Sequence, residues 1–140
     1  MITNFIATYK TIVNAPIEKV WDALTLSEIV KQYFFGTNQQ TTWEIGSPIS
    51  WEGEYDGKSF LDKGVVLEFN PKKNLKYSYF SNWSGLPDLP ENYILVEYQV
   101  KSIGNKTELT IHQANYNAEK QKESVENWEY LINDLKKVVE

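Results

Sequence analysis

The spacing of apolar residues changes twice along the chain, and this change limits the fold more than any other feature. Between about residues 39 and 115 apolar residues recur at every second position, whereas in residues 16–33 before this segment and 117–138 after it they recur every three or four positions. In YILVEYQVK, the apolar residues Ile94, Val96, Tyr98 and Val100 alternate with mostly polar neighbours. This pattern is typical of an antiparallel sheet that is covered on one face only.

Further runs with the same period predict the rest of the sheet. Turn signals such as Asp56-Gly57, Asn70-Pro71 and Gly104-Asn105 separate them. The residues expected to point inward are Ile49, Trp51 and Tyr55; Val65, Leu67 and Phe69; Leu75, Tyr77 and Tyr79; and Leu109 and Ile111. With a β-branched run at residues 3–13, these segments indicate six or seven strands.

Helical spacing at both ends predicts the layer that covers the sheet. A short helix is expected at residues 16–25. A second short helix, with Ser27 as its N-cap, is expected to run to about Tyr33. The chain ends in an amphipathic helix from about Asn117 to Val138. Its apolar stripe consists of Val125, Trp128, Leu131, Ile132, Leu135 and Val139.

The length of this last helix matches the expected width of the sheet. A helix of about 22 residues spans about 33 Å at 1.5 Å per residue. Six or seven strands spaced about 4.8 Å apart cover a similar width. We therefore predict one α+β domain over residues 1–140, in which a curved antiparallel sheet wraps around a long C-terminal helix.

The composition excludes several classes of function. The net charge is −5, and all 14 basic residues are Lys, so the chain lacks the basic footprint of a nucleic-acid-binding protein. It has no Cys, no apolar run long enough for a membrane span and no secretory signal at residues 1–11. We expect a soluble, cytoplasmic protein with no nucleic-acid or membrane partner and an undetermined oligomeric state.

No motif for catalysis, metal binding or a cofactor is evident. By strand parity His112, the one histidine, lies on the solvent face, where it cannot act as a base on an enclosed substrate. Glu52, Glu54 and Asp56 alternate with inward aromatics and are expected to form a solvated strand face rather than a cation site. We predict no catalytic residues, no metal site and no cofactor.

Aromatic residues make up 14% of the chain, and many are expected on the inner face of the sheet. They either fill a core or line a pocket; buried tyrosine hydroxyls need partners, which favours a pocket. The predicted cavity-lining residues are Trp43, Trp51, Tyr55, Tyr77, Tyr79, Tyr98, Trp128 and Leu131. The predicted mouth or lid residues are Tyr33, Phe34, Phe35, Trp83 and Leu86, and the loop that carries Trp83 covers either a cavity mouth or one end of the core.

Local motifs resemble a known family. Ala15-Pro16 with Val20–Thr25 (VWDALT), Lys31–Phe34 (KQYF) and Gly64–Glu68 (GVVLE) are similar to motifs of the family of the activator of heat-shock protein 90 ATPase, in its C-terminal domain. Trp128, Leu131 and Leu135 resemble the final helix signature of that family. The family is part of the START-like (SRPBCC) superfamily, so the resemblance implies the helix-grip fold.

Three hypotheses of function follow. The first is non-catalytic binding of a hydrophobic or aromatic small molecule between the sheet and the C-terminal helix. The second, implied by the resemblance, is a stress-response role as a co-chaperone that stimulates the heat-shock protein 90 ATPase. The third, also implied by the superfamily, is a cyclase- or dehydratase-type enzyme; it ranks last because no inward His or carboxylate is evident beside the tyrosines.

Overall fold

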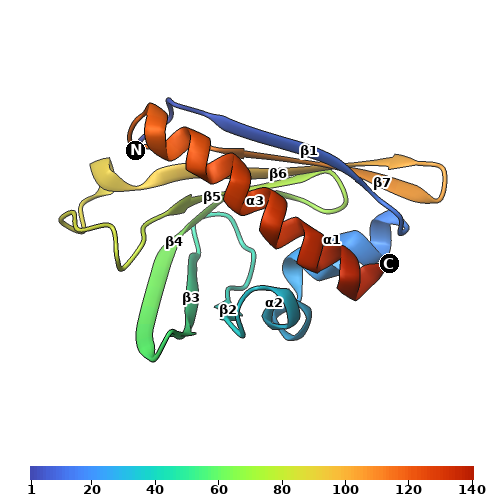
Figure 1. The fold of residues 1–140 in the computed structure, drawn as a ribbon, viewed down its shortest axis with the longest axis horizontal. Coiled ribbons are helices and arrows are strands. Elements are labelled where there is room, and N and C mark those ends of the chain that lie inside the picture. Colours follow the sequence, from blue (N-terminus) through green and yellow to red (C-terminus); the bar gives the residue numbers. More distant parts are fainter.

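Seven strands form one antiparallel sheet in the order β1-β7-β6-β5-β4-β3-β2 (Figure 1). The structure is a computed structural model, and it describes all residues from Met1 to Glu140. The strands are β1 (Ala7–Val13), β2 (Asn38–Gln40), β3 (Pro48–Tyr55), β4 (Lys58–Asn70), β5 (Asn74–Tyr79), β6 (Ile94–Ile103) and β7 (Lys106–Gln113). From β2 to β7, each strand is hydrogen-bonded to the strand that follows it in the sequence. Strand β1 pairs with β7 instead of β2.

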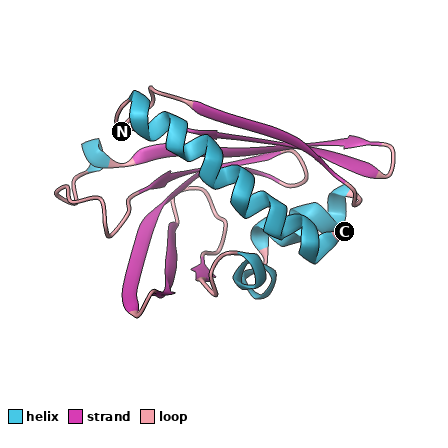
Figure 2. Ribbon diagram, in the orientation of Figure 1, coloured by secondary structure: helices cyan, strands magenta, loops and turns pink.

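The helices cover one face of this sheet. Helices α1 (Ile17–Thr25) and α2 (Ser27–Tyr33) follow β1, α3 (Ala118–Val139) ends the chain, and a short 3-10 helix, η1 (Pro90–Asn92), precedes β6. Figure 2 shows α3 crossing the sheet diagonally, with α1 and α2 beside its C-terminal end. The predicted helix-grip architecture is confirmed. None of the helices is both long and apolar enough to cross a membrane.

The ends of the helices agree with the sequence at α3 and differ at α2. Asn117 caps α3, since its side chain accepts a hydrogen bond of 2.8 Å from the Lys120 amide. Ser27 does not cap α2 as expected. It is the first residue of that helix, and its hydroxyl donates to Asn38 Oδ1 at 3.0 Å instead. This bond joins α2 to β2. The sequence pattern did not predict β2 as a separate strand.

The core lies between the inner face of the sheet and α3. Alternate residues of β6 and β7 are buried as predicted, including Val96, Tyr98, Leu109 and Ile111. From α3, the stripe contributes Trp128, Leu131, Ile132, Leu135 and Val139 to the same cluster. The packing of one helix stripe against the apolar sheet face therefore forms a single hydrophobic core.

The middle of β4 differs from the predicted alternation. Val66 is 1% exposed, whereas Val65, expected to point inward, is 38% exposed. The register with β5 shifts between Val66 and Glu68, which leaves Leu67 as an extra residue and reverses the faces beyond it. Beyond the bulge Phe69 points inward, as predicted. A strict period of two cannot reveal such a bulge.

At Gly64, β4 passes so close to β5 that no side chain fits. A Cβ atom there would lie 1.6 Å from the carbonyl oxygen of Ser78. We predict that Gly64→Ala lowers the free energy of unfolding by about 1–3 kcal/mol or more, because backbone must move to admit the methyl group. Gly53→Ala is the matched control, since the tight contact of its Cβ would be with the tip of the Phe60 ring, at 3.0 Å, and the nearest backbone atom, Thr37 Cα, is at an ordinary contact distance of 3.5 Å. Chemical denaturation of both variants tests this, and equal losses would contradict it.

Candidate functional site

A cavity of about 390 Å³ lies between the inner face of the sheet and α3. Its wall comes from strands β3, β5, β6 and β7, from α3 and from the segment that follows α2. The lining residues are Phe34, Phe35, Trp51, Tyr77, Tyr79, Val96, Gln113, Ser124, Asn127, Trp128, Tyr130 and Leu131. Phe35 and Tyr130 are among the exposed residues of the chain, so the cavity opens to solvent beside them.

Seven residues predicted for the cavity or its mouth lie in this wall. They are Trp51, Tyr77, Tyr79, Trp128, Leu131, Phe34 and Phe35. The Trp51 ring packs against two tyrosines of the wall, with centroid distances of 4.9 Å to Tyr77 and 5.3 Å to Tyr79. These three residues come from β3 and β5, which are separated in the sheet by β4.

Both indole N–H groups of the wall are already paired within the protein. Trp51 Nε1 donates to Gln39 Oε1 at 2.9 Å, and Trp128 Nε1 donates to Gln113 Oε1 at 2.8 Å. The hydrogen bonds fix the orientation of both rings. The indoles therefore offer apolar surface to an occupant, and no free donor.

Two predicted lining residues lie behind the wall or away from it. Tyr98 is buried beneath the cavity, where its hydroxyl accepts from that of Tyr77 at 3.1 Å and its ring meets Trp128 edge-on. Trp43 stacks on Phe69 at 5.2 Å and donates to the Thr25 carbonyl at 3.1 Å. Both side chains belong to the packing around the cavity rather than to its surface.

Tyr55 differs from the expected inward orientation. It is 52% exposed and is the last residue of β3, at the turn into β4, beyond the part of the sheet that α3 covers. Its ring contacts Phe35 at a centroid distance of 5.3 Å. Parity assigns the correct strand face, but the hairpin tip extends past the helix that would bury it.

The predicted mouth residues divide into three groups. Tyr33 is buried, and its hydroxyl donates to the Ala23 carbonyl at 2.6 Å, so it joins α1 to α2 instead of forming a mouth. Phe34 and Phe35 lie in the wall. Trp83 packs on Phe60 at 5.4 Å, beside Tyr55, at the base of the long loop. Leu86 is exposed in the same loop and does not line the cavity.

Asp62 is a carboxylate on the inner face of β4 that the sequence analysis missed. Its Oδ2 atom accepts from the Tyr79 hydroxyl at 2.5 Å, and its Oδ1 atom accepts from the Asn82 amide at 2.8 Å. The expectation that no inward carboxylate accompanies the tyrosines is therefore wrong. The signal was present in strand parity, because Asp62 pairs with the inward Trp51 across β3 and β4, but residues 58–64 were not interpreted as a strand.

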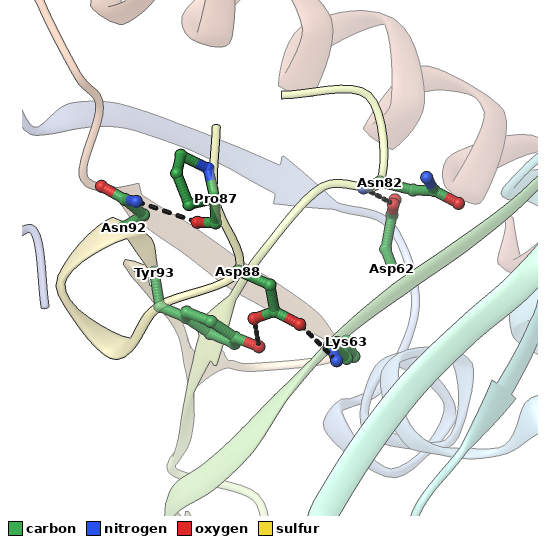
Figure 3. Close-up of polar contacts among 7 residues, drawn as sticks. All are labelled: Asp62, Lys63, Asn82, Pro87, Asp88, Asn92 and Tyr93. Atoms are coloured by element: carbon green, nitrogen blue, oxygen red, sulfur yellow. Dashed lines mark hydrogen bonds and ion pairs between the residues drawn. The ribbon is translucent and has the colours of Figure 1, made fainter. Parts of the chain in front are cut away.

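The residues around Asp62 also anchor the long loop between β5 and β6 (Figure 3). The neighbouring Lys63 forms an ion pair of 2.5 Å with Asp88, which accepts from the Tyr93 hydroxyl at 2.6 Å. Asn82 at the start of the loop and Asp88 in its middle are thus held by two consecutive residues of β4. The loop is tied to the rim of the sheet and covers the Phe60 end of it.

Burial keeps the inward tyrosine hydroxyls protonated. It raises the pKa of Tyr33, Tyr77 and Tyr79 well above the usual tyrosine value, and that of Tyr98 to about 12. Each of these hydroxyls is paired within the protein, with Ala23, Tyr98, Asp62 and Tyr77 respectively. The need of these buried hydroxyls for partners is thus met within the protein, and the bonds hold the side chains of the wall in place.

The buried hydroxyl of the site that has no partner belongs to Ser124, which the sequence analysis also missed. Ser124 is 4% exposed, lies in the cavity wall, and its Oγ atom has no hydrogen-bond partner. A helical serine can donate to the carbonyl four residues earlier, but no such bond is formed here. Its spacing from Trp128 and Leu131 places it on the apolar stripe of α3, and a polar residue on such a stripe is the signal that could have identified it.

The polar residues considered for catalysis or metal binding lie away from the cavity. His112 lies on the outer face of β7, where its Nδ1 atom is 3.0 Å from the Thr8 hydroxyl. Glu52 and Glu54 are exposed on β3, on the face opposite Trp51. None of these three side chains is in reach of the cavity lining.

Comparison with known families gives one match that covers most of the chain. The model of the family described as "Activator of Hsp90 ATPase homolog 1-like protein" matches residues 14–140. The match begins at the residue before Ala15-Pro16 and runs to the end of α3. None of the curated proteins matches the chain in sequence.

Several solved structures share the fold. The solution structure of ChR145 from Cytophaga hutchinsonii is 45% identical, with a TM-score of 0.83 over 98% of this chain and 94% of that one. CalU16 from Micromonospora echinospora is 20% identical, with a TM-score of 0.76 over 94% of this chain and 74% of that one. The Aha1 dimer from Colwellia psychrerythraea is 17% identical, with a TM-score of 0.74 over 96% of both chains.

The raised pKa of Tyr98 predicts a loss of stability at high pH. The unfolded chain releases this proton near pH 10, whereas the folded protein keeps it until about pH 12. Stability from this group is thus fully present below pH 10 and is lost as the pH rises toward 12, at about 1.4 kcal/mol per pKa unit. Between pH 10 and pH 12 the free energy of unfolding of Tyr98→Phe should therefore fall by about 2 kcal/mol less than that of the wild-type protein. Denaturant unfolding at several pH values measures it, and an unchanged slope in the variant would contradict it.

Proposed function

The chain belongs to the family of Activator of Hsp90 ATPase homolog 1-like proteins, and we propose that within this fold it binds a hydrophobic or aromatic small molecule without chemical conversion. The binding site is the cavity between the inner sheet face and α3. Trp51, Tyr77, Trp128 and Leu131 supply the apolar contacts, and Phe35 forms the rim.

The composition of the cavity wall is the observation that carries this proposal. Nine of its twelve residues are hydrophobic, and none of the twelve carries a charge. A volume of about 390 Å³ falls in the range of small-molecule sites. An apolar wall with a few polar groups favours ligands that gain free energy by burying apolar surface. Such a wall has no charge to compensate that of a charged ligand.

The pairing of the wall's polar groups supports binding over catalysis. The Trp51 and Trp128 indoles and the Tyr77 and Tyr79 hydroxyls each donate to another protein group. Such bonds keep the wall in one shape before a ligand arrives, which reduces the entropy lost on binding.

Titration with the fluorescent probe N-phenyl-1-naphthylamine tests the proposal. We expect saturable binding, weakened about fivefold by Phe35→Ala, because an aromatic contact contributes about 1 kcal/mol. Ile103→Ala is the matched control, since Ile103 is similarly exposed but lies at the end of β6, outside the cavity. The absence of binding, or equal binding by both variants, would refute the proposal.

Association with a heat-shock protein 90 is the second candidate, and the family description supports it. The exposed aromatic rings of Phe35, Tyr55 and Trp83 form a surface of the kind that protein partners contact. Measuring the ATPase rate of a heat-shock protein 90 with and without this protein separates the two candidates. A higher ATPase rate with the wild-type protein, and a smaller increase with Trp83→Ala, would support the partner role. An ATPase rate that the wild-type protein leaves unchanged would exclude it.

A further inference from the structure

A second cavity adjoins the first, and the two share four wall residues. It has a volume of about 330 Å³ and lies toward the N-terminal half of α3 and the loop that carries Trp83. The shared residues are Tyr79, Gln113, Ser124 and Asn127. Only four of the twelve residues of the second cavity are hydrophobic, against nine of twelve in the first. The pair therefore forms an apolar lobe and a polar lobe that meet at these four side chains.

We propose that the two lobes together bind an elongated molecule with an apolar or aromatic body and a neutral, amide-like end, which pairs with Ser124 and Asn127. This inference rests on the proposed function for the apolar body and adds the polar end. The body occupies the lobe beside Trp51 and Trp128, and the end group lies where the lobes meet.

Unused hydrogen-bonding capacity at the junction carries the inference. The Ser124 hydroxyl is buried without a partner. No intramolecular hydrogen bond engages the exposed side-chain amide of Asn127, which is therefore available to donate and accept. Gln113 Nε2 makes one bond, to Asn115 Oδ1 at 3.3 Å, and keeps its second proton. These groups offer several donors and an acceptor, which is the complement of a carboxamide.

The charges around the polar lobe favour a neutral end group. Lys120 and Glu123 are the charged residues of its wall, and they pair with each other at 3.4 Å. Their opposite charges offset each other, so the wall of the polar lobe has no net charge. A carboxylate would exchange its hydration for neutral donors beside the negative charge of Glu123, whereas an amide has a much smaller desolvation cost, which hydrogen bonds to these donors can offset.

Three probes with the same naphthalene body and different ends test the inference. They are the amide 2-(2-naphthyl)acetamide, the carboxylate 2-(2-naphthyl)acetate and the hydrocarbon 2-ethylnaphthalene. Calorimetric titration should give the amide about fivefold tighter binding than the hydrocarbon, as expected for one additional net hydrogen bond. Ser124→Ala should remove this advantage, because it should weaken binding of the amide but not binding of 2-ethylnaphthalene, which forms no hydrogen bond with the hydroxyl. The same variant should raise the melting temperature of the unliganded protein, because it removes an unpaired buried hydroxyl.

A second pair of variants keeps the test independent of folding effects. Asn127→Ala and Asn133→Ala make the same change at exposed positions of α3, but only Asn127 lies in the wall. Only Asn127→Ala should weaken amide binding. Binding of 2-ethylnaphthalene as tight as that of the amide, with no effect of Ser124→Ala, would overturn the polar end and leave the proposed function standing. Failure of all three probes to bind would overturn both.

Discussion

The structure depends on one helix covering the inner face of a seven-stranded sheet. Six spacings of about 4.8 Å make the sheet about 29 Å wide, whereas a helix with its side chains is about 10–12 Å across. The diagonal course of α3 and the addition of α1 and α2 extend the cover (Figure 1). Between these layers a cavity remains, and its wall includes Trp51 on β3 and Trp128 on α3.

Trp128 links the core and the cavity. Its ring meets Tyr98 edge-on in the core at 5.6 Å, and its indole N–H bonds to Gln113, a residue of both cavity walls. Tyr98 in turn accepts from Tyr77, another wall residue. Because these contacts are continuous, the packing that stabilises the fold also fixes the shape of the wall. The shape of the cavity is therefore set by the same side-chain packing that forms the hydrophobic core.

The success of sequence reasoning depended on how regular each strand is. The facing of β6 and β7 was predicted correctly because these strands pair without interruption and lie under α3. The bulge at Leu67, the hairpin tip at Tyr55 and the inward carboxylate of Asp62 were missed. Strand parity carries no information on where a partner strand slips or where a covering helix ends. Those depend on contacts between segments that are distant in the sequence, as between Asp62 and Tyr79.

Accounting for polar groups separates the structural residues of the site from the residues available to a ligand. The sequence draws attention to the tyrosine hydroxyls, but those of the buried Tyr33, Tyr77, Tyr79 and Tyr98 are paired within the protein and therefore add rigidity. Ser124 is inconspicuous in the sequence, yet its hydroxyl is buried and unpaired, a condition that costs about 1–3 kcal/mol of stability. Alanine at this position of α3 would avoid that cost and would also favour the helix. Ser124 lies in the wall shared by two adjoining cavities and its hydroxyl has no partner within the protein, so a ligand that reaches both cavities can supply a hydrogen bond that the protein does not.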